Sequence, residues 1–333
     1  MGGILQPSVL GLGGALVDLL YHVPLEFLSR IPGEKGGTVH VGPEEMEGLL
    51  GMLPPQGGSI VRGGATANTL AALAHLGTPA ALIGKTGDDE AGRWYREQLR
   101  REGVDVSLLK ISCTLPTGRV LSLITPDADR TMRSCLAASA ELRVDDLLES
   151  DFAGKRLLYV EGYALCDEAV VLRACELARA QGMEVHFDLS SPEVVRAHRK
   201  FLLEVLPRYV KTIYANLQEA HALCGMQDAP EETLHALAQF CAEPILKLGE
   251  RGVLLLEGRA VVSVPGCSVK AVDGTGAGDF WAAGYLHGVL EGWSRERAAW
   301  LGNLVASEVV QVTGAVLPEE RWQFIHEHMR IQK

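Results

Sequence analysis

The second half of the chain alternates short apolar runs with longer amphipathic runs, and this alternation constrains the fold more than any other feature. The apolar runs predict strands at 157–160, 185–188, 212–215 and 244–248. The segments between and after them have helical spacing, which predicts helices near 168–181, 192–205, 217–223 and 231–242. Strands that alternate with helices form a parallel sheet covered on both faces. We therefore expect a three-layer α/β fold with a mostly parallel central sheet.

The rest of the chain contains the same kinds of element in a less regular order. We expect a first strand at 9–17 that ends at Asp18, helices at 66–76 and 88–102, and a strand at 80–83. Beyond residue 250 we expect a strand pair at 252–257 and 260–264, then helices at 277–291, 295–312 and 319–330. No internal repeat or low-complexity segment interrupts this order, and a chain of 333 residues could form one large domain or two modest ones.

Two segments do not fit the alternation. Residues 21–58 lack a strong period and are rich in Gly, Pro and Glu, whereas residues 117–136 alternate in the manner of exposed strands. We expect these two segments to form a small β lid on the main domain.

Composition excludes several classes of protein. A formal net charge of −11 argues against a nucleic-acid partner, which needs a basic face. The apolar stretch at 4–20 is broken by Pro7, by glycines and by Asp18, so it predicts no membrane span. The Cys count of 7 is odd and no CxxC pair occurs, which argues against disulfides and zinc. A reducing, cytoplasmic location is the expectation that follows.

The strongest local signal is the segment VDGTGAGDFWAAG at residues 272–284. Just before an apolar helix begins, Gly274, Gly276 and Gly278 have no side chains that would block access to the backbone. A helix start offers free N–H groups and the positive end of the helix dipole, which suits a phosphate group. Asp279 lies in the first helical turn, where a carboxylate can take a proton from an attacking hydroxyl. The glycines alone leave open a simple turn in which Asp279 is only a helix-start charge.

Two other phosphate-binding patterns are excluded. The Walker pattern GxxxxGK[ST] is absent, which removes the P-loop kinases. The segment GLGGAL at 11–16 has Leu16 where a dinucleotide fingerprint needs a small Gly or Ala, so a Rossmann dehydrogenase is rejected.

Residues 272–284 resemble the C-terminal signature of the PfkB (ribokinase-like) kinases, Asp-Thr-x-Gly-Ala-Gly-Asp. Three further segments resemble motifs of that family in the same order: RGGATANTLAALAHLG at 62–77 followed by IGKTGDDEAG at 83–92, YANLQEA at 214–220, and LKLGERGVLLLEG at 246–258. Together they span most of the chain. The resemblance implies a ribokinase-like fold and a single kinase domain over residues 1–333. It also implies an ATP-dependent phosphotransferase that moves the γ-phosphate onto a hydroxyl of a small sugar or nucleoside.

The resemblance also implies roles for individual residues. Asp279 would be the catalytic base, with an anion hole formed by the amides of Gly276, Ala277 and Gly278. The residues that would meet the acceptor are Asp18, Gly63, Gly64 and Asn68. The residues that would meet the nucleotide are Asn216, Glu219, Gly249, Gly252, Thr275, Asn303 and Arg130. Glu219 would also hold Mg²⁺ through water, since Mg²⁺ keeps several waters and needs no all-protein cage.

The acceptor stays open between a sugar and a nucleoside. DRTMRSCLAASAEL at 129–142 and FDLSSPEVVR at 187–196 resemble the adenosine-kinase-like branch. However, Gly14 stands where adenosine kinases usually have Asn, and Gly274 replaces the usual Thr of the C-terminal signature. A nucleoside base needs an apolar or aromatic surface, and Tyr21, Phe27 and Leu123 are the candidates in the lid segments.

The resemblance leaves three further points open. It is compatible with a monomer or a homodimer, and it does not decide whether a monovalent cation is required. A different class of protein, a ligand-binding regulator that keeps the fold without the chemistry, predicts damage to the base or the anion hole. The sequence shows no such damage.

Overall fold

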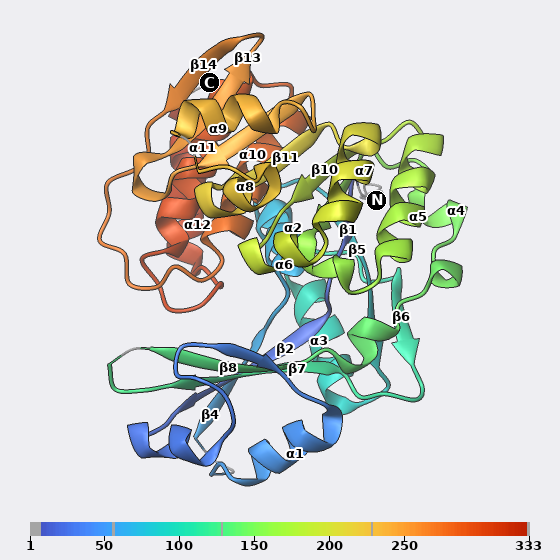
Figure 1. Cartoon of the computed structure of the whole chain (residues 1–333), viewed down its shortest axis with the longest axis vertical. Helices are drawn as coiled ribbons and strands as arrows, with labels where there is room; N and C mark the ends of the chain where they lie inside the picture. Colours follow the sequence, from blue (N-terminus) through green and yellow to red (C-terminus); the bar gives the residue numbers. More distant parts are fainter. Residues whose placement is uncertain (1–7, 55–56, 128, 228, 332–333) are drawn as a thin grey trace.

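The central layer of the molecule is a large sheet with helices packed on both of its faces. The computed structural model describes residues 8–54, 57–127, 129–227 and 229–331 (Figure 1). Within these residues the strand order of the large sheet is β14-β13-β12-β11-β10-β9-β1-β5-β6. Its strands are β1 (Val9–Leu12), β5 (Ala80–Gly87), β6 (Leu109–Ser112), β9 (Leu157–Glu161), β10 (Glu184–Asp188), β11 (Thr212–Asn216), β12 (Glu243–Lys247), β13 (Val253–Glu257) and β14 (Ala260–Val264).

Neighbouring strands of this sheet run parallel from β6 to β12, whereas β13 pairs antiparallel with both β12 and β14. Strands β13 and β14 are joined by a short turn at 258–259, whereas each parallel neighbour needs a crossover connection. The strands at 157–161, 184–188, 212–216 and 243–247 lie within one residue of the predicted positions.

Helices cover both faces of the sheet. One face carries α2 (Ala65–His75), α3 (Glu90–Arg101), α10 (Ala277–Leu290), α11 (Arg295–Val309) and α12 (Glu319–Ile331). The other face carries α5 (Glu168–Ala180), α7 (Arg199–Tyr209), α8 (Leu217–Cys224) and α9 (Pro230–Leu237). Side chains along β9 alternate between the two faces. Leu157 and Tyr159 pack under the helices of the first face, and Leu158 and Val160 pack under those of the other face. The predicted three-layer α/β fold is confirmed.

A second, smaller sheet lies apart from these layers, in the lower part of Figure 1. Its strand order is β3-β8-β7-β2-β4. The strands are β2 (Leu16–His22), β3 (Thr38–His40), β4 (Gly58–Arg62), β7 (Gly118–Ile124) and β8 (Arg130–Cys135). Helix α1 (Pro43–Gly51) and a 3₁₀ turn at Leu25–Arg30 pack on one face of it and give this sheet its own core. The first part of the small sheet runs from residue 16 to residue 62 and so exceeds the expected segment 21–58, whereas β7 and β8 lie within the expected segment 117–136.

The expected single first strand at 9–17 is wrong. The chain leaves the central sheet after Leu12 and enters the small sheet at Leu16, so Asp18 lies inside β2 rather than at the end of a central strand. The reason is a close contact that hydrophobic periodicity does not reveal. A Cβ at Gly13 would lie 2.4 Å from Thr66 Oγ1, so the backbone passes directly over the start of α2 and turns there.

The helix expected at 192–205 is also two helices, α6 (Pro192–Ala197) and α7, which meet at His198. The remaining predicted helices differ from the observed bounds by a few residues at their ends. In the described part of the chain no helix is long and apolar enough to cross a membrane.

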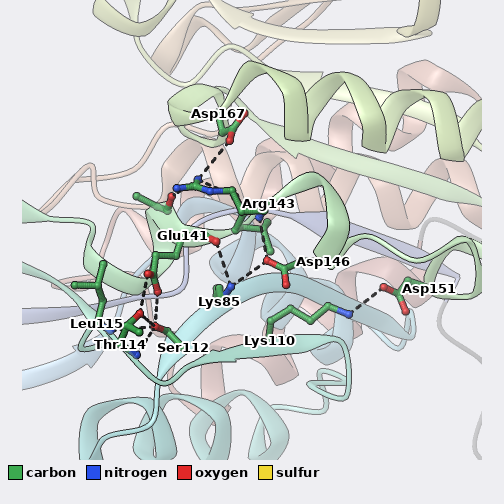
Figure 2. A network of polar contacts seen from close by, with 12 residues as sticks. Lys85, Lys110, Ser112, Thr114, Leu115, Glu141, Arg143, Asp146, Asp151 and Asp167 are labelled. Atoms are coloured by element: carbon green, nitrogen blue, oxygen red, sulfur yellow. Dashed lines mark hydrogen bonds and ion pairs between the residues drawn. The ribbon is translucent and has the colours of Figure 1, made fainter.

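A polar network fastens the segment that leads from the small sheet back to β9 (Figure 2). Lys85 of β5 donates to the carbonyl of Glu141 at 3.2 Å and to Asp146 Oδ2 at 3.0 Å. Next to it, Lys110 of β6 forms an ion pair of 3.1 Å with Asp151. These contacts hold residues 141–151 against the edge of the central sheet, which fixes one attachment point of the small sheet.

Candidate active site

A pocket of about 760 Å³ opens where the carboxyl ends of β10, β11 and β12 face the start of α10. Open α/β sheets bind their ligands at this edge. The predicted residues that line the pocket are Asn216, Glu219, Gly249, Gly252, Gly276, Ala277, Gly278, Asp279 and Asn303. Residues expected at the nucleotide, at the anion hole and at the base therefore share one cavity.

The glycine-rich loop forms the start of α10. Gly276 has a φ of +77°, and a Cβ there would lie 2.7 Å from Ala315 Cβ, so only glycine fits this position. Within the described residues the amides of Gly276 and Gly278 make no backbone hydrogen bond, whereas the amide of Ala277 donates to the carbonyl of Gly274 at 3.2 Å. Two of the three expected anion-hole amides are thus free to bind a ligand, and the third is engaged within the turn.

Asp279 lies in the first turn of α10, at the wall of the pocket. Its Oδ2 accepts a hydrogen bond of 2.8 Å from Asn68 Nδ2. Burial raises the pKa of Asp279 to about 7, against the opposing effect of the Asn68 hydrogen bond, and the negative charges of Asp188 and Glu161 add to the rise. A carboxylate with a pKa near neutrality is suited to accept a proton.

A buried arginine orients the contact between Asn68 and Asp279. Arg62 is 5% exposed and donates from Nη1 to Asn68 Oδ1 at 2.7 Å, while its Nη2 lies 3.0 Å from Glu102 Oε2. Because the amide oxygen of Asn68 is taken by Arg62, the amide nitrogen is left to donate to Asp279. Arg62 opens the segment that resembles the N-terminal motif, but we did not expect a role for it.

Asp18, Gly63 and Gly64 form a second group, outside the lining of the 760 Å³ pocket. A Cβ at Gly63 would lie 2.2 Å from Asp18 Oδ1, so the carboxylate of β2 rests on the glycine backbone. Burial raises the pKa of Asp18 to about 7, and the positive charges of Arg62 and Arg130 oppose the rise. Arg62 thus connects the two groups, since it interacts with Asp18 and with the Asn68 that holds Asp279.

Asn216 and Glu219 bind each other at the start of α8. The Asn216 side chain accepts from the Glu219 amide at 2.9 Å, and Glu219 accepts from the Asn216 amide at 2.8 Å and from Nδ2 at 2.7 Å. This reciprocal capping box fixes both side chains. Glu219 is 4% exposed, so it is not a solvated helix charge. Among the described residues no group of three or more His, Cys, Asp or Glu side chains could hold a metal ion directly.

The far end of the pocket is built from turns and from α11. Gly252 has a φ of +88°, and a Cβ there would lie 2.1 Å from the carbonyl oxygen of Val264. Asn303 accepts a hydrogen bond of 2.8 Å from the Trp281 indole and donates to the carbonyls of Val264 and Pro265. Its amide group is therefore occupied in shaping the pocket wall.

Arg130 and Thr275 lie together outside the pocket lining. Arg130, at the start of β8, donates to Thr275 Oγ1 at 2.7 Å and to Asp273 Oδ2 at 2.6 Å. Asp273 also accepts from Thr275 and from the amide of Gly314. The small sheet is thus tied directly to the loop that precedes the free amides of α10.

Sequence reasoning missed three charged residues at the carboxyl ends of central strands. Asp188 and Lys247 line the pocket and form an ion pair of 3.0 Å. Glu161 is 2% exposed and accepts from the amides of Gly14 and Thr66 at 2.8 and 2.5 Å. The ends of the predicted strands were the available signal, since Asp188 is the last residue of one and Glu161 and Lys247 lie within one residue of the ends of two others, and such residues reach the ligand-binding edge of a parallel sheet.

Comparison with known proteins decides the family. The model of the pfkB family of carbohydrate kinases matches residues 52–322. The chain is a PfkB-family kinase. An adenosine kinase of Saccharomyces cerevisiae is 26% identical over 93% of this chain and 96% of its own. The structure of an adenosine kinase from Sinorhizobium meliloti is 31% identical, with a TM-score of 0.86 over 98% of this chain and all of that one.

A second solved structure is described as a probable sugar kinase from Rhizobium etli. It is 29% identical to this PfkB-family kinase, with a TM-score of 0.88 over 98% of this chain and 99% of that one. Similar proteins therefore include kinases named for a nucleoside and kinases named for sugars. The chain is a sugar or nucleoside kinase that acts on a small molecule, and kinases of this family use ATP.

Proposed function

We propose that this kinase transfers the γ-phosphate of ATP to a hydroxyl of a small sugar or nucleoside, with Asp279 as general base. The observation that carries the proposal is the position of Asp279 in the first turn of α10, beside the free amides of Gly276 and Gly278. A preorganised donor aimed at a developing negative charge contributes more to rate than most other single groups.

The proposed transfer forms one bond to the γ-phosphorus and breaks another. The acceptor oxygen forms a bond to the γ-phosphorus while the bond from that phosphorus to the bridging oxygen of ADP breaks. The acceptor proton passes to the carboxylate of Asp279, and ADP leaves with the bonding electron pair. Asn68 keeps Asp279 in place, while Gly276 and Gly278 donate to the migrating group. Positioning and charge stabilisation supply most of the catalysis in reactions of this type.

The charged residues of the pocket fit a nucleotide with a hydrated Mg²⁺ ion. Mg²⁺ neutralises phosphate charge when it is bound. Glu219 is held rigidly by Asn216 and faces the pocket, so it would hold the ion through water. Gly249 and Gly252, both with positive φ, leave the backbone open toward the nucleotide.

We further propose that the small sheet is a lid that carries acceptor contacts. The strand register puts Leu20, Val120, Ser122 and Met132 on the same face as Asp18. Tyr21, Phe27 and Leu123 instead pack in the core on the opposite face. The three side chains considered for a nucleoside base therefore do not face Asp18, and an acceptor would meet aliphatic and hydroxyl groups there.

An acceptor panel tests the proposed activity. We expect product formation that needs both ATP and Mg²⁺ with at least one member of a set of ribose, fructose, other small sugars and nucleosides, measured by mass of the phosphorylated product. The adenosine kinase of known structure, 31% identical over nearly the whole chain, favours a nucleoside as the second candidate. Activity on sugars with none on adenosine would remove that candidate. Absence of product with every acceptor would favour a non-catalytic regulator.

The pH dependence follows from the raised pKa of Asp279. The base must be ionised to accept a proton, and it is protonated below a pKa of about 7. We expect kcat/KM to fall on the acid side of about pH 7, by about tenfold per pH unit once the group is mostly protonated. A profile that stays flat from pH 8 to pH 5 would contradict an Asp279 base.

A further inference from the structure

Lys247 is the one cation in the described lining of the pocket. It is the last residue of β12, and its neighbours in that lining include the carboxylates of Asp188, Glu219 and Asp279. A site that receives a polyphosphate needs positive charge, and the carboxylates supply the opposite sign. The position of this single ammonium group therefore decides which part of the phosphate chain meets a fixed cation.

The ammonium group lies against the start of α10. A Cβ placed on Gly278 would be 3.3 Å from Lys247 Nζ, so the ammonium is close to the backbone that bears the free amide of Gly278. Gly278 precedes Asp279 in the chain. Lys247 thus stands beside the same turn as the proposed base, and its charge lowers the pKa of Asp279.

Asp188 fixes the ammonium in this place. Its Oδ2 lies 3.0 Å from Lys247 Nζ, and its Oδ1 accepts a hydrogen bond of 2.9 Å from the amide of Ser190. The lysine and aspartate side chains are only 16% and 9% exposed. Burial lowers the pKa of Lys247, but the carboxylates of Asp188 and Glu219 more than offset this effect, and the pKa is raised. The group is therefore an ammonium ion throughout the neutral range.

We propose that Lys247 is a catalytic residue that binds the γ-phosphoryl group during transfer, and that Asp188 is the positioning residue that holds it there. The inference rests on the proposed phosphoryl transfer and adds a third donor to the amides of Gly276 and Gly278. The γ-phosphoryl is the group concerned because Lys247 lies beside the turn that carries Asp279, where transfer must occur. A cation at this point stabilises the charge that spreads over the phosphoryl oxygens.

Steady-state kinetics of Lys247→Met test the assignment. Loss of one preorganised donor to the transferring group lowers kcat by about 10²–10³-fold, so we expect a fall in that range with a smaller change in the KM for the acceptor. Lys247→Arg, which keeps the charge, should recover part of the lost rate. Lys211→Met, which removes a lysine paired with Glu184 at the other end of the sheet, is the matched control and should retain wild-type turnover.

Nucleotide binding separates a phosphoryl contact from a structural role. In the presence of Mg²⁺, Lys247→Met should weaken binding of the β,γ-imido analogue of ATP while leaving the affinity for ADP near that of the wild type, as measured by calorimetry. Retained ADP binding also shows that the variant is folded. Equal weakening of both ligands, or a fall in kcat of less than about tenfold, overturns the proposal, because one donor to the reacting group is worth more than that.

The acid limb of the kcat/KM profile gives an independent check. The groups that act on Asp279 are Asn68 by its hydrogen bond and Asp188, Glu161 and Lys247 by their charges. Removal of the lysine charge should move the acid limb to higher pH, and an unmoved or downward-shifted limb counts against the proposal. If the wild type phosphorylates no acceptor, the proposed function fails, whereas the comparison of ADP with the ATP analogue still tests Lys247.

Discussion

Asp279→Asn is expected to lower kcat by about 10²–10⁴-fold, the usual contribution of a positioned general base. The substitution keeps the size of the side chain, and its amide oxygen can still accept from Asn68. What it removes is the ability to take a proton from the acceptor hydroxyl. The KM values should change much less than kcat, because a general base contributes in the transition state rather than to substrate binding. Initial rates under saturating ATP and acceptor measure the effect.

Two controls make this result specific. Asp88→Asn removes a surface carboxylate, 65% exposed and paired with Arg93, and should leave turnover unchanged. Unfolding of Asp279→Asn in urea at pH 8 should require at least as much free energy as unfolding of the wild type. The folded protein binds the Asp279 proton more tightly than the unfolded chain, so the wild type loses stability as pH rises from about 4 to about 7. Turnover equal in Asp279→Asn and wild type would remove the assigned base.

Gly64→Ala is expected to reduce the free energy of unfolding by about 2–6 kcal/mol. Gly64 has a φ of +94°, and an L-residue in such a conformation costs about 1–3 kcal/mol. A Cβ at this position would also lie 2.2 Å from the carbonyl oxygen of Gly14, and forcing extra atoms into a packed site adds about 1–3 kcal/mol. Urea denaturation at neutral pH measures the loss.

Gly77→Ala provides a matched control for the clash with the carbonyl oxygen of Gly14. Gly77 has nearly the same φ, +93°, at the other end of α2, but no atom lies within 4 Å of the position of its Cβ. This variant should lose only the conformational part, about 1–3 kcal/mol. Equal losses in the two variants would show that the contact between Gly64 and Gly14 does not limit the packing of the β1–β2 turn.

Periodicity located β9, β10, β11 and β12 to within one residue because these apolar runs alternate with amphipathic helices, but it did not predict β6. It failed at residues 9–17, where the apolar pattern continues through Gly13 although the backbone changes sheets. The cause of that change is a contact with Thr66, far along the chain, and single-sequence patterns carry no information on such contacts. The same limit applies to the helix at 192–205, which ends early at His198 without a proline or glycine to mark the break.

The motifs located the glycine-rich turn and Asp279, because a phosphate-binding helix start has a local sequence pattern. They did not find Arg62 and Lys247. Each of these cations depends on partners from separate elements, such as Glu102 for Arg62 and Asp188 for Lys247. A lone Arg or Lys in a sequence does not differ from a solvated surface charge until the fold shows that it is buried and what it pairs with.

The passage of the chain from one sheet to the other at residues 13–15 has a mechanical consequence. Asp279 lies on α10, which packs on the large sheet. Asp18 lies on β2 of the small sheet, three residues beyond residue 15. Any rotation of the small sheet about residues 13–15 moves Asp18 toward or away from Asp279 by the same motion. In the proposed mechanism, such a movement would change the contact of Asp18 with the acceptor and the distance of the acceptor from Asp279 at the same time.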